Sequence, residues 1–485
     1  MDVGKIKRIQ LLYLSDDLRK NLRRLHMTIQ FKQTLAPTKD NSGKPIILSD
    51  ATFAQRKEKV LQLMRKYDFS SLMIYADKEH GSNFEYLTGF IPRFEEAIQV
   101  INQDGTSILI LGNENYNKTS MARTQSEGVL CPFFSLPNQP MDFTKTFADY
   151  LKDIKVDDSK RIGLVDWKLL SNDMNNFHNH HSVPAFIVDG VHEVFGYDKV
   201  VNATQLYMHP KEGARVTNNA EEIARYEYGA SLASDAILEA MNQLNIGQSE
   251  LEAGNRLNRD GQYPSVVTIA AFGDRFKGAN IYPTDNTLND GDKVALTVAY
   301  KGGLSSRSGY AVKDESQLAE RDPGYLEEVV FPYFQAYKWW LNNLTIGKKG
   351  GDFYQAFSEF YPQATYGWNL CPGHLVADEE WLSSPFYKDS DATIQSGYIF
   401  QLDFIPSQAD HNGVSAESTI AVADAALREE IKIKQPELWS RISKRKDYLK
   451  EALGLALPEH LLPLASTFAY YRPFLLDKET AIYFG

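Results

Sequence analysis

The sequence SGYIFQLDFIP, residues 396–406, carries an acidic side chain in the middle of an apolar run. Side chains alternate between the two faces of a strand, so a strand here places Gln401 and Asp403 on one face and apolar neighbours on the other. Burying a carboxylate is costly unless the charge is paired or bound to a metal. Asp403 is therefore a candidate functional residue.

Two further candidates flank this strand in the sequence. His374 follows a Pro-Gly pair in LCPGHL (370–375), and Glu417 lies at the start of AESTIAVAD (416–424). Carboxylate oxygens and an imidazole that converge from adjacent elements suit a divalent ion such as Mn²⁺, Zn²⁺ or Fe²⁺. Each residue taken singly also fits a strand edge, a loop histidine or a solvated strand end, and spacing alone does not show that the three meet.

The chain around these residues predicts an α+β domain. Strands are expected at 292–300 and 310–313, on either side of the Gly-rich segment YKGGLSSRSGY (300–310), which we interpret as a hairpin turn. Helices are expected at 326–344 and at about 426–453. Strands and helices do not alternate strictly here, which favours α+β over a parallel doubly wound sheet.

The first half of the chain alternates helices and strands and predicts an α/β domain. A helix is expected at 53–67, and AIQVIN (97–102) and SILILG (107–112) predict a hairpin joined by an Asp-Gly turn. The apolar runs RIGLVDW (161–167) and PAFIVDG (184–190) continue the strand pattern.

A segment rich in Pro, Gly and Asn, MHPKEGARVTNN (208–219), separates the two halves. We therefore place an N-terminal domain at 28–206 and a C-terminal domain at 207–485. Asn218 or Asn219 is expected to cap the helix that follows, with Glu221 and Glu222 in its first turn.

Residues 1–27 form a predicted basic arm ahead of both domains. Lysine and arginine lie among apolar positions there, as in a basic amphipathic helix that contacts anionic lipid or a partner. A packed or frayed terminal arm, or a true translation start at Met27, explains the same pattern.

The composition of the 485 residues, 43% hydrophobic and 24% charged, is that of a globular protein of more than one domain. The net charge of −11 gives no global attraction for phosphate backbones, so nucleic acid is not an expected partner. Apolar runs are only strand-sized, so we expect no membrane span and no export signal. Two cysteines cannot build a disulfide framework, which fits a reducing compartment and a cytoplasmic location.

The order of these motifs resembles the creatinase/aminopeptidase P (M24, pita-bread) family over nearly the whole chain past residue 50. The N-terminal part of the resemblance is IYADKEHGSNFEYLTGF (74–90). The C-terminal part consists, in order, of EEIARYEYGASLASDAI, YPSVV, LNDGDKVALTV, PGH, SGYIFQLDFIP and AESTIAVAD. The resemblance implies an α/β creatinase-type N-terminal domain, an α+β pita-bread C-terminal domain and a homodimer.

In the peptidases that the chain resembles, one histidine, two aspartates and two glutamates hold two metal ions. Carried over by position, the histidine falls on His374, the first glutamate on Asp403 and the second on Glu417. These residues also form the expected catalytic group, with His374 and Glu417 in acid–base roles.

Both aspartates of that ligand set are absent. The first falls on Thr297, and the second falls on Ser306 or Ser308. The substrate-binding histidines of the family align with Asn280 and near Trp381, which we expect to contact the substrate.

The remaining ligands, two carboxylates and one imidazole, balance the charge of one divalent ion rather than two. A single ion would leave open positions for water and substrate, as in a hydrolase of a small amide, guanidino compound or short Xaa-Pro-type peptide. A metal-free hydrolase, as creatinase is, would rely on His374 as proton shuttle. A non-catalytic pita-bread binding protein is the alternative from another functional class.

Weaker candidates lie elsewhere in the sequence. Arg307 falls in the family's active-site hairpin and is expected to bind a substrate carboxylate. The cluster FHNHHS (177–182) contains His178, His180 and His181, which suggest either a metal site or, more in keeping with adjacent histidines, a solvated loop. Cys371 is a nucleophile, a soft ligand or a small buried thiol.

Overall fold

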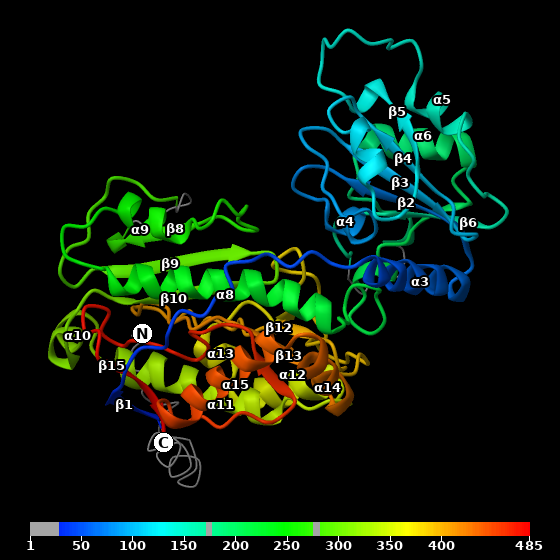
Figure 1. Cartoon of the computed structure of the whole chain (residues 1–485). Coiled ribbons are helices and arrows are strands. Elements are labelled where there is room, and N and C mark those ends of the chain that lie inside the picture. Colours follow the sequence, from blue (N-terminus) through cyan, green and yellow to red (C-terminus); the bar gives the residue numbers. More distant parts are fainter. Residues whose placement is uncertain (1–28, 171–176, 275–281) are drawn as a thin grey trace, which may run out of the picture. The chain divides into compact units, whose positions relative to one another are not determined.

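The structure, a computed structural model, describes residues 29–170, 177–274 and 282–485, which form two compact units (Figure 1). The N-terminal unit comprises Ile46–Arg225 and the short segment Ala377–Ser383. The C-terminal unit comprises the described residues up to Pro45, Tyr226–Val376 and Ser384–Gly485. The predicted basic arm with Met27, and Asn280, lie outside the described residues.

The N-terminal unit is built on a mixed sheet with its described strands in the order β5-β4-β3-β2-β6-β7. The strands are β2 (Phe69–Ala76), β3 (Ala97–Asn102), β4 (Ser107–Leu111), β5 (Glu127–Leu130), β6 (Arg161–Val165) and β7 (Val200–Asn202). The α-helices are α3 (Asp50–Lys66), α4 (Ser82–Thr88), α5 (Phe147–Lys152), α6 (Ala185–Phe195) and α7 (Gln205–Met208). Short 3₁₀ turns are η1 (Tyr116–Met121), η2 (Pro132–Phe134) and η3 (Phe177–Asn179).

The core of this unit lies between the sheet and helices α5 and α6. Phe147 and Leu151 of α5 and Ile187 and Val191 of α6 pack against buried strand side chains. The predicted β3–β4 hairpin is present, and Gly105 in its Asp-Gly turn has a positive φ of 87°. This is the α/β architecture that the sequence predicted.

One segment of the N-terminal unit differs from the prediction. The run 184–190, interpreted as a strand, begins α6 instead. Its buried residues Ile187, Gly190 and Val191 follow helical spacing, whereas a short apolar run does not by itself distinguish a helix from a buried strand.

The C-terminal unit contains antiparallel sheets and long helices. Its strands are β1 (Ile29–Gln33), β8 (Ile269–Phe272), β9 (Lys293–Tyr300), β10 (Gly303–Tyr310), β11 (His374–Leu375), β12 (Ile399–Gln401), β13 (Thr419–Val422), β14 (Leu461–Pro463) and β15 (Thr480–Phe484). Its helices are α9 (Glu250–Leu257), α10 (Glu315–Arg321), the π-helical turn η5 (Leu326–Val330), α11 (Phe331–Asn343), α12 (Gly350–Phe360), α13 (Gln363–Tyr366), α14 (Ala425–Lys434) and α15 (Pro436–Glu451). Helix α8 (Ala220–Asn242) begins in the N-terminal unit and continues in this one.

Strand pairing divides these strands into the sheet β10-β9-β8, the sheet β11-β12-β13-β14 and the pair β1-β15. The segment 303–310, interpreted as part of a turn, is strand β10, and the turn is confined to Lys301 and Gly302. The single closing helix expected at about 426–453 is two helices, because Pro436 starts α15 after a break at Gln435.

The units begin and end at different residues from the predicted domains. Strand β1, expected in the N-terminal domain, belongs to the C-terminal unit because it pairs with β15, with Ile29 opposite Phe484. Residues 207–225, expected in the C-terminal domain, belong to the N-terminal unit, where the Tyr86 hydroxyl donates to Ala214 O at 2.8 Å. Asn219 caps α8 as predicted, since its side chain accepts from the Glu222 amide at 2.9 Å.

Helix α8 anchors the β9–β10 hairpin through two glycines. A Cβ atom on Gly229 of α8 would lie 1.9 Å from Lys301 O, and one on Gly302 would lie 2.2 Å from Tyr226 O. Gly302 also has a φ of 108°, a backbone conformation that residues other than glycine rarely adopt. The hairpin turn therefore sits directly on the helix, as Figure 1 shows for α8, β9 and β10.

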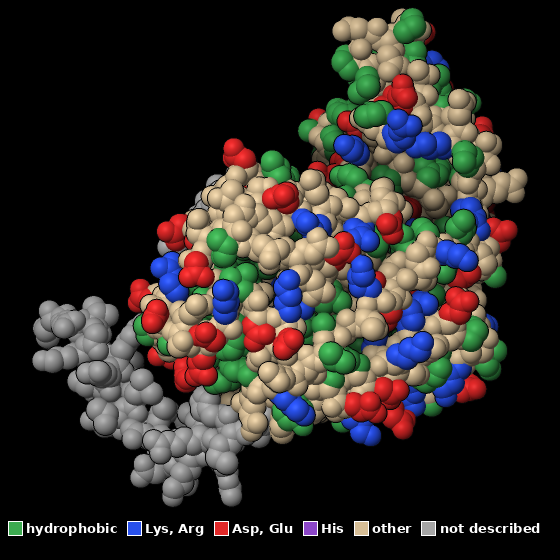
Figure 2. Space-filling view, turned by 60° about the vertical axis from the view of Figure 1, so that its left-hand side comes forward, with side chains coloured by type: hydrophobic (Ala, Val, Ile, Leu, Met, Phe, Trp, Pro, Cys, Tyr) green, Lys and Arg blue, Asp and Glu red, His purple; other side chains and the backbone are tan. Residues whose placement is uncertain are grey.

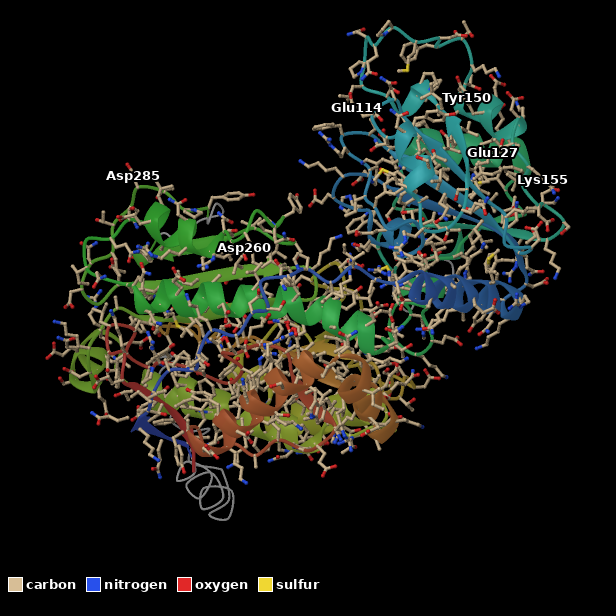
Figure 3. The ribbon with its side chains drawn as sticks, in the orientation of Figure 1. Glu114, Glu127, Tyr150, Lys155, Asp260 and Asp285 are labelled. Carbon is tan, nitrogen blue, oxygen red and sulfur yellow. The ribbon has the colours of Figure 1, made fainter. Side chains whose placement is uncertain are left out.

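The surface carries charges of both signs. Figure 2 shows acidic and basic side chains interspersed over the visible face. Charged side chains also project from the outside of each unit in Figure 3, namely Glu114, Glu127 and Lys155 on the N-terminal unit and Asp260 and Asp285 on the C-terminal unit. Within the described residues, every helix is too short or too polar to cross a lipid bilayer.

Candidate metal centre

Strand register brings the three predicted ligands to one place in the C-terminal unit. In the sheet, Gln401 of β12 lies opposite His374 of β11 on one side and opposite Thr419 of β13 on the other. Asp403 and Glu417 each lie two residues beyond Gln401 and Thr419, so antiparallel pairing sets them at the same strand ends. Period-two alternation then puts all three candidate side chains on the face that carries Gln401.

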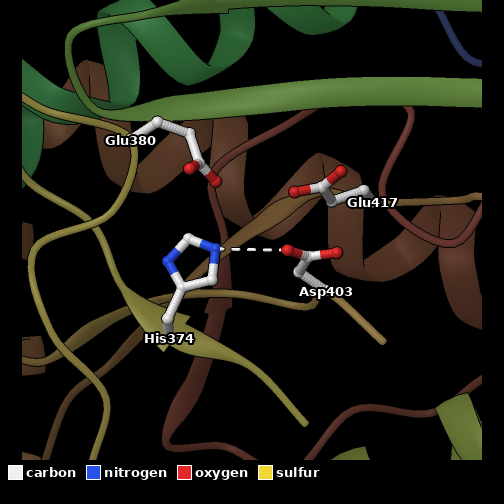
Figure 4. A group of neighbouring side chains, drawn as sticks. All are labelled: His374, Glu380, Asp403 and Glu417. Carbon is white, nitrogen blue, oxygen red and sulfur yellow. Dashed lines mark ion pairs between the residues drawn. The ribbon is translucent and has the colours of Figure 1, made fainter. Parts of the chain in front are cut away.

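Figure 4 shows this group of side chains. His374 Nε2 and Asp403 Oδ2 are 3.6 Å apart, and one ligand atom from each of His374, Asp403 and Glu417 lies within 4.8 Å of the others. The three residues are at most 5% exposed. Figure 4 also draws Glu380, a residue of the N-terminal unit.

The orientation of His374 is fixed by its neighbours. Its Nδ1 lies 3.3 Å from Leu375 O, and its Nε2 lies on the side of Asp403. With the proton on Nδ1, Nε2 is the nitrogen able to bind an ion. The preceding Pro-Gly turn is held by the Trp340 indole, which donates to Pro372 O at 2.5 Å. Gly373 there has a φ of 119°. The motif PGH therefore needs its glycine for the turn that delivers the histidine.

Gln401 joins the strands that carry the site. Its amide donates to Leu304 O at 2.6 Å, which links β12 to β10. The Thr419 hydroxyl donates to Gln401 Oε1 at 2.8 Å, which links β12 to β13. Gln401 and Trp340 are positioning residues that the sequence did not single out, although Gln401 shares the predicted face of Asp403.

The two positions of the missing aspartates face each other across the β9–β10 hairpin. Thr297 and Ser306 are register partners, and the Thr297 hydroxyl donates to Ser306 Oγ at 2.9 Å. Ser308 lies opposite Ala295 instead, and its hydroxyl donates to Gly413 O at 3.2 Å. Of the two serines that the sequence left open, Ser306 is therefore the one paired with Thr297.

The structure contradicts the expectation that Arg307 binds a substrate carboxylate. Arg307 is 1% exposed, and its guanidinium donates to backbone carbonyls and one hydroxyl of this unit. The acceptors are Tyr470 O, Ser306 O, Glu417 O, Ser418 Oγ and Thr467 O. Burial also lowers the pKa of the Arg307 guanidinium from its usual value. Its role is structural: it holds the backbone of Glu417 against β10.

We expect Arg307→Lys to lower the free energy of unfolding by about 2–4 kcal/mol, because an ammonium has too few donors for these buried acceptors. Urea denaturation measures this change. The matched control is Arg65→Lys on α3, whose side chain is 48% exposed and contacts Glu58. Equal stabilities of the two variants, with a raised KM in Arg307→Lys, would instead support the substrate-binding role.

The structure also places the other residues that the sequence singled out. Trp381 is 41% exposed and lies in the N-terminal unit. Cys371 is a free thiol, and burial raises its pKa, which argues against a nucleophile. In the cluster 177–182, His178 and His180 are exposed, whereas the side chain of His181 is 4% exposed.

The donors in the C-terminal unit fit one divalent ion. One imidazole nitrogen and two carboxylate oxygens are ligand types that zinc, manganese and iron ions bind. Metal–ligand bonds of about 2.0–2.2 Å need donor atoms no more than roughly 4 Å apart, so the observed group would close by less than about 1 Å. The paired hydroxyls of Thr297 and Ser306 bring no charge that would balance a second ion.

The fold is similar to those of several solved structures. An Xaa-Pro dipeptidase from Bacillus anthracis matches with a TM-score of 0.57 at 15% identity, covering 77% of this chain and 96% of that one. A prolidase from Pyrococcus horikoshii matches with a TM-score of 0.57 at 16% identity, covering 76% and 95%. An X-Pro aminopeptidase from Thermotoga maritima matches with a TM-score of 0.57 at 17% identity, covering 76% and 95%. No family model and no curated protein sequence matches the chain.

These likenesses confirm the predicted fold class, an α/β creatinase-type unit followed by an α+β pita-bread unit. At such low identities they establish the fold alone.

Proposed function

We propose that this chain is a hydrolase that cleaves a carbon–nitrogen bond in a short Xaa-Pro-type peptide, a small amide or a guanidino compound. The observation that carries the proposal is the convergence of His374, Asp403 and Glu417 in a buried group. The fold is also shared with an Xaa-Pro dipeptidase and a prolidase.

In this proposal the three residues hold a single ion of Mn, Zn or Fe. His374 would bind the ion through Nε2, with the proton on Nδ1 directed at Leu375 O. Asp403 and Glu417 supply negative charge, and the backbone of Glu417 is fixed by Arg307 at 3.1 Å. A bound divalent ion supplies Lewis acidity that lowers the pKa of water toward about 7.

The proposed proton transfers belong to Glu417 and His374. A carboxylate next to the reacting water can accept its proton and pass it to the leaving nitrogen. Without an ion, the imidazole of His374 can carry that proton instead, and Asp403 would stabilise its cationic form. Trp381 and Asn280 stay sequence-based proposals for contacts with the substrate.

Metal content and hydrolysis test the proposal together. We expect protein purified without added metal to carry about one divalent ion per chain, measured by elemental analysis, because the donor charges balance one ion. A panel of Xaa-Pro dipeptides, small amides and creatine-like compounds should include a hydrolysed substrate. Chelation should abolish the hydrolysis, and re-adding the ion should restore it.

Other outcomes separate the alternatives. Full activity in metal-free protein would contradict the role of an ion and favour His374 as a proton shuttle. Protein that binds an ion but hydrolyses nothing in the panel would favour a non-catalytic binding protein. This second candidate is supported by the hydroxyls of Thr297 and Ser306, which stand where the peptidases that the chain resembles have two aspartate ligands.

We also propose a cytoplasmic location and a homodimer. The free thiols Cys131 and Cys371 are in keeping with a reducing compartment. The homodimer rests on the sequence resemblance, and light scattering on the purified chain measures it.

A further inference from the structure

A buried carboxylate at the end of β6 organises the histidine cluster of the N-terminal unit. Asp166 has no exposed side-chain surface. Its Oδ2 accepts hydrogen bonds from the backbone amide and the hydroxyl of Ser182 and from the Asn202 amide at 3.1 Å. Its Oδ1 lies 3.3 Å from His181 Nδ1. The donors around Oδ2 leave the carboxylate in one orientation, facing His181.

This contact determines which nitrogen of His181 carries the proton. An ionised carboxylate only accepts hydrogen bonds, so in the neutral imidazole the proton is on Nδ1, and Nε2 is the nitrogen able to bind a ligand. Nε2 is buried and has no hydrogen-bond partner among the described residues. A buried polar atom left in this way costs about 1–3 kcal/mol. Such an atom calls for an explanation, and a bound ion would provide one.

A second imidazole faces His181. His192, on α6, has its ring centroid 6.2 Å from that of His181, with the rings at 68°. The ring of Tyr197 packs against the ring of His192, with the two centroids 4.1 Å apart. Burial, and then the neighbouring His181, lower the pKa of His192, which keeps the imidazole neutral and able to act as a ligand.

We propose that His181 and His192 bind one divalent transition-metal ion, with Zn²⁺ as the model ion, and that Asp166 orients His181 for it. A carboxylate on the far nitrogen of a histidine is the usual arrangement behind a metal-bound imidazole. Metal–nitrogen bonds of about 2.0–2.1 Å put two imidazole centroids on one ion roughly 5–6.5 Å apart, a range that includes the observed separation.

The remaining positions on the ion would be taken by water or by an oxygen or nitrogen ligand from outside the chain. The site shares no residue with His374, Asp403 and Glu417, which belong to the C-terminal unit. The proposal therefore stands independently of the proposed hydrolase activity.

Zinc titration of the untagged full-length chain tests the site. Calorimetry on His374→Ala protein, in which the other group lacks a ligand, should reveal one Zn²⁺ site. Adding His181→Gln or His192→Gln should weaken it at least tenfold, and Asp166→Asn should weaken it about 10–100-fold. With Co²⁺ in place of Zn²⁺, the absorption of a tetrahedral site should appear in the His374→Ala protein. It should disappear when His181→Gln or His192→Gln is added.

The matched controls are His178→Gln and His180→Gln, which alter exposed histidines of the same segment. Both should bind zinc as the parent does. Unchanged zinc affinity in His181→Gln and His192→Gln would overturn the proposal, as would an equal loss in the two controls. Circular dichroism identifies a variant that fails to fold. If His181→Gln does not fold, the zinc affinity of His192→Gln decides the outcome, because His192 is the more exposed of the two.

Discussion

Replacing His374 with alanine, or Glu417 with glutamine, is expected to remove the ion of the C-terminal unit and to lower hydrolysis by more than ~100-fold. Loss of a residue that only orients a ligand already costs about 10–100-fold, and these substitutions act on a ligand directly, by deleting it or by removing its charge. The two variants act on different chemistry, since one deletes the imidazole and the other only neutralises a carboxylate. Elemental analysis and the initial rate on the best dipeptide measure the effects.

Glu417→Gln is the more informative of the two because its shape is unchanged. The hydrogen bond from Arg307 goes to the Glu417 backbone and is retained in the variant. The matched control is Glu459→Gln, whose side chain is 90% exposed and contacts Arg428. Glu417→Gln protein with a full complement of metal and wild-type activity would contradict both the ligand and the proton-transfer role.

The double variant Thr297→Asp/Ser306→Asp is expected to raise metal content from about one to about two ions per chain. The two hydroxyls face each other at 2.9 Å across the hairpin, where the peptidases that the chain resembles are expected to carry aspartates. Two added carboxylates supply the negative charge that a second divalent ion requires. Zinc or manganese titration followed by elemental analysis counts the ions.

The same variant makes a second prediction about stability. Without metal, two carboxylates this close in a buried hairpin repel each other, so the melting temperature should fall below that of the wild type. Excess metal should restore it, since a ligand at 1,000 times its Kd adds about 4 kcal/mol. The control Ser308→Asp sits on the same strand opposite Ala295 and should gain no ion. A double variant that stays at one ion would show that these positions do not face the site.

The site was predictable to the extent that it follows from local rules. Asp403 stood out because a carboxylate in an apolar strand needs a partner, and Glu417 and His374 because they flank that strand in a fixed order. Their spacing left open whether the three meet, and it is the antiparallel register of the structure that places them on one face. The capping residue Asn219 was likewise visible in the sequence, since capping is local chemistry.

Other features depended on contacts between distant parts of the chain. The segment with Ser306 and Arg307 looked like a turn because it is rich in glycine and serine, whereas pairing with β9 makes it a strand. From the sequence, Arg307 looked like an anion-binding residue. The carbonyls that its guanidinium binds come from distant parts of the chain, so only the tertiary structure shows them. The same holds for His181, whose partner Asp166 is fixed by β6 and whose neighbour His192 comes from a helix interpreted as a strand.

By itself, the sequence determined the two-part fold class and singled out three candidate ligands for an ion. Period-two alternation, helix capping and the free-energy cost of burying a charge depend on a few neighbouring residues, so the sequence alone reveals them. The tertiary structure decided that β1 joins the C-terminal unit, that Ser306 rather than Ser308 pairs with Thr297, and that Arg307 is structural. These outcomes rest on hydrogen bonds between residues far apart in sequence, for which no local pattern exists.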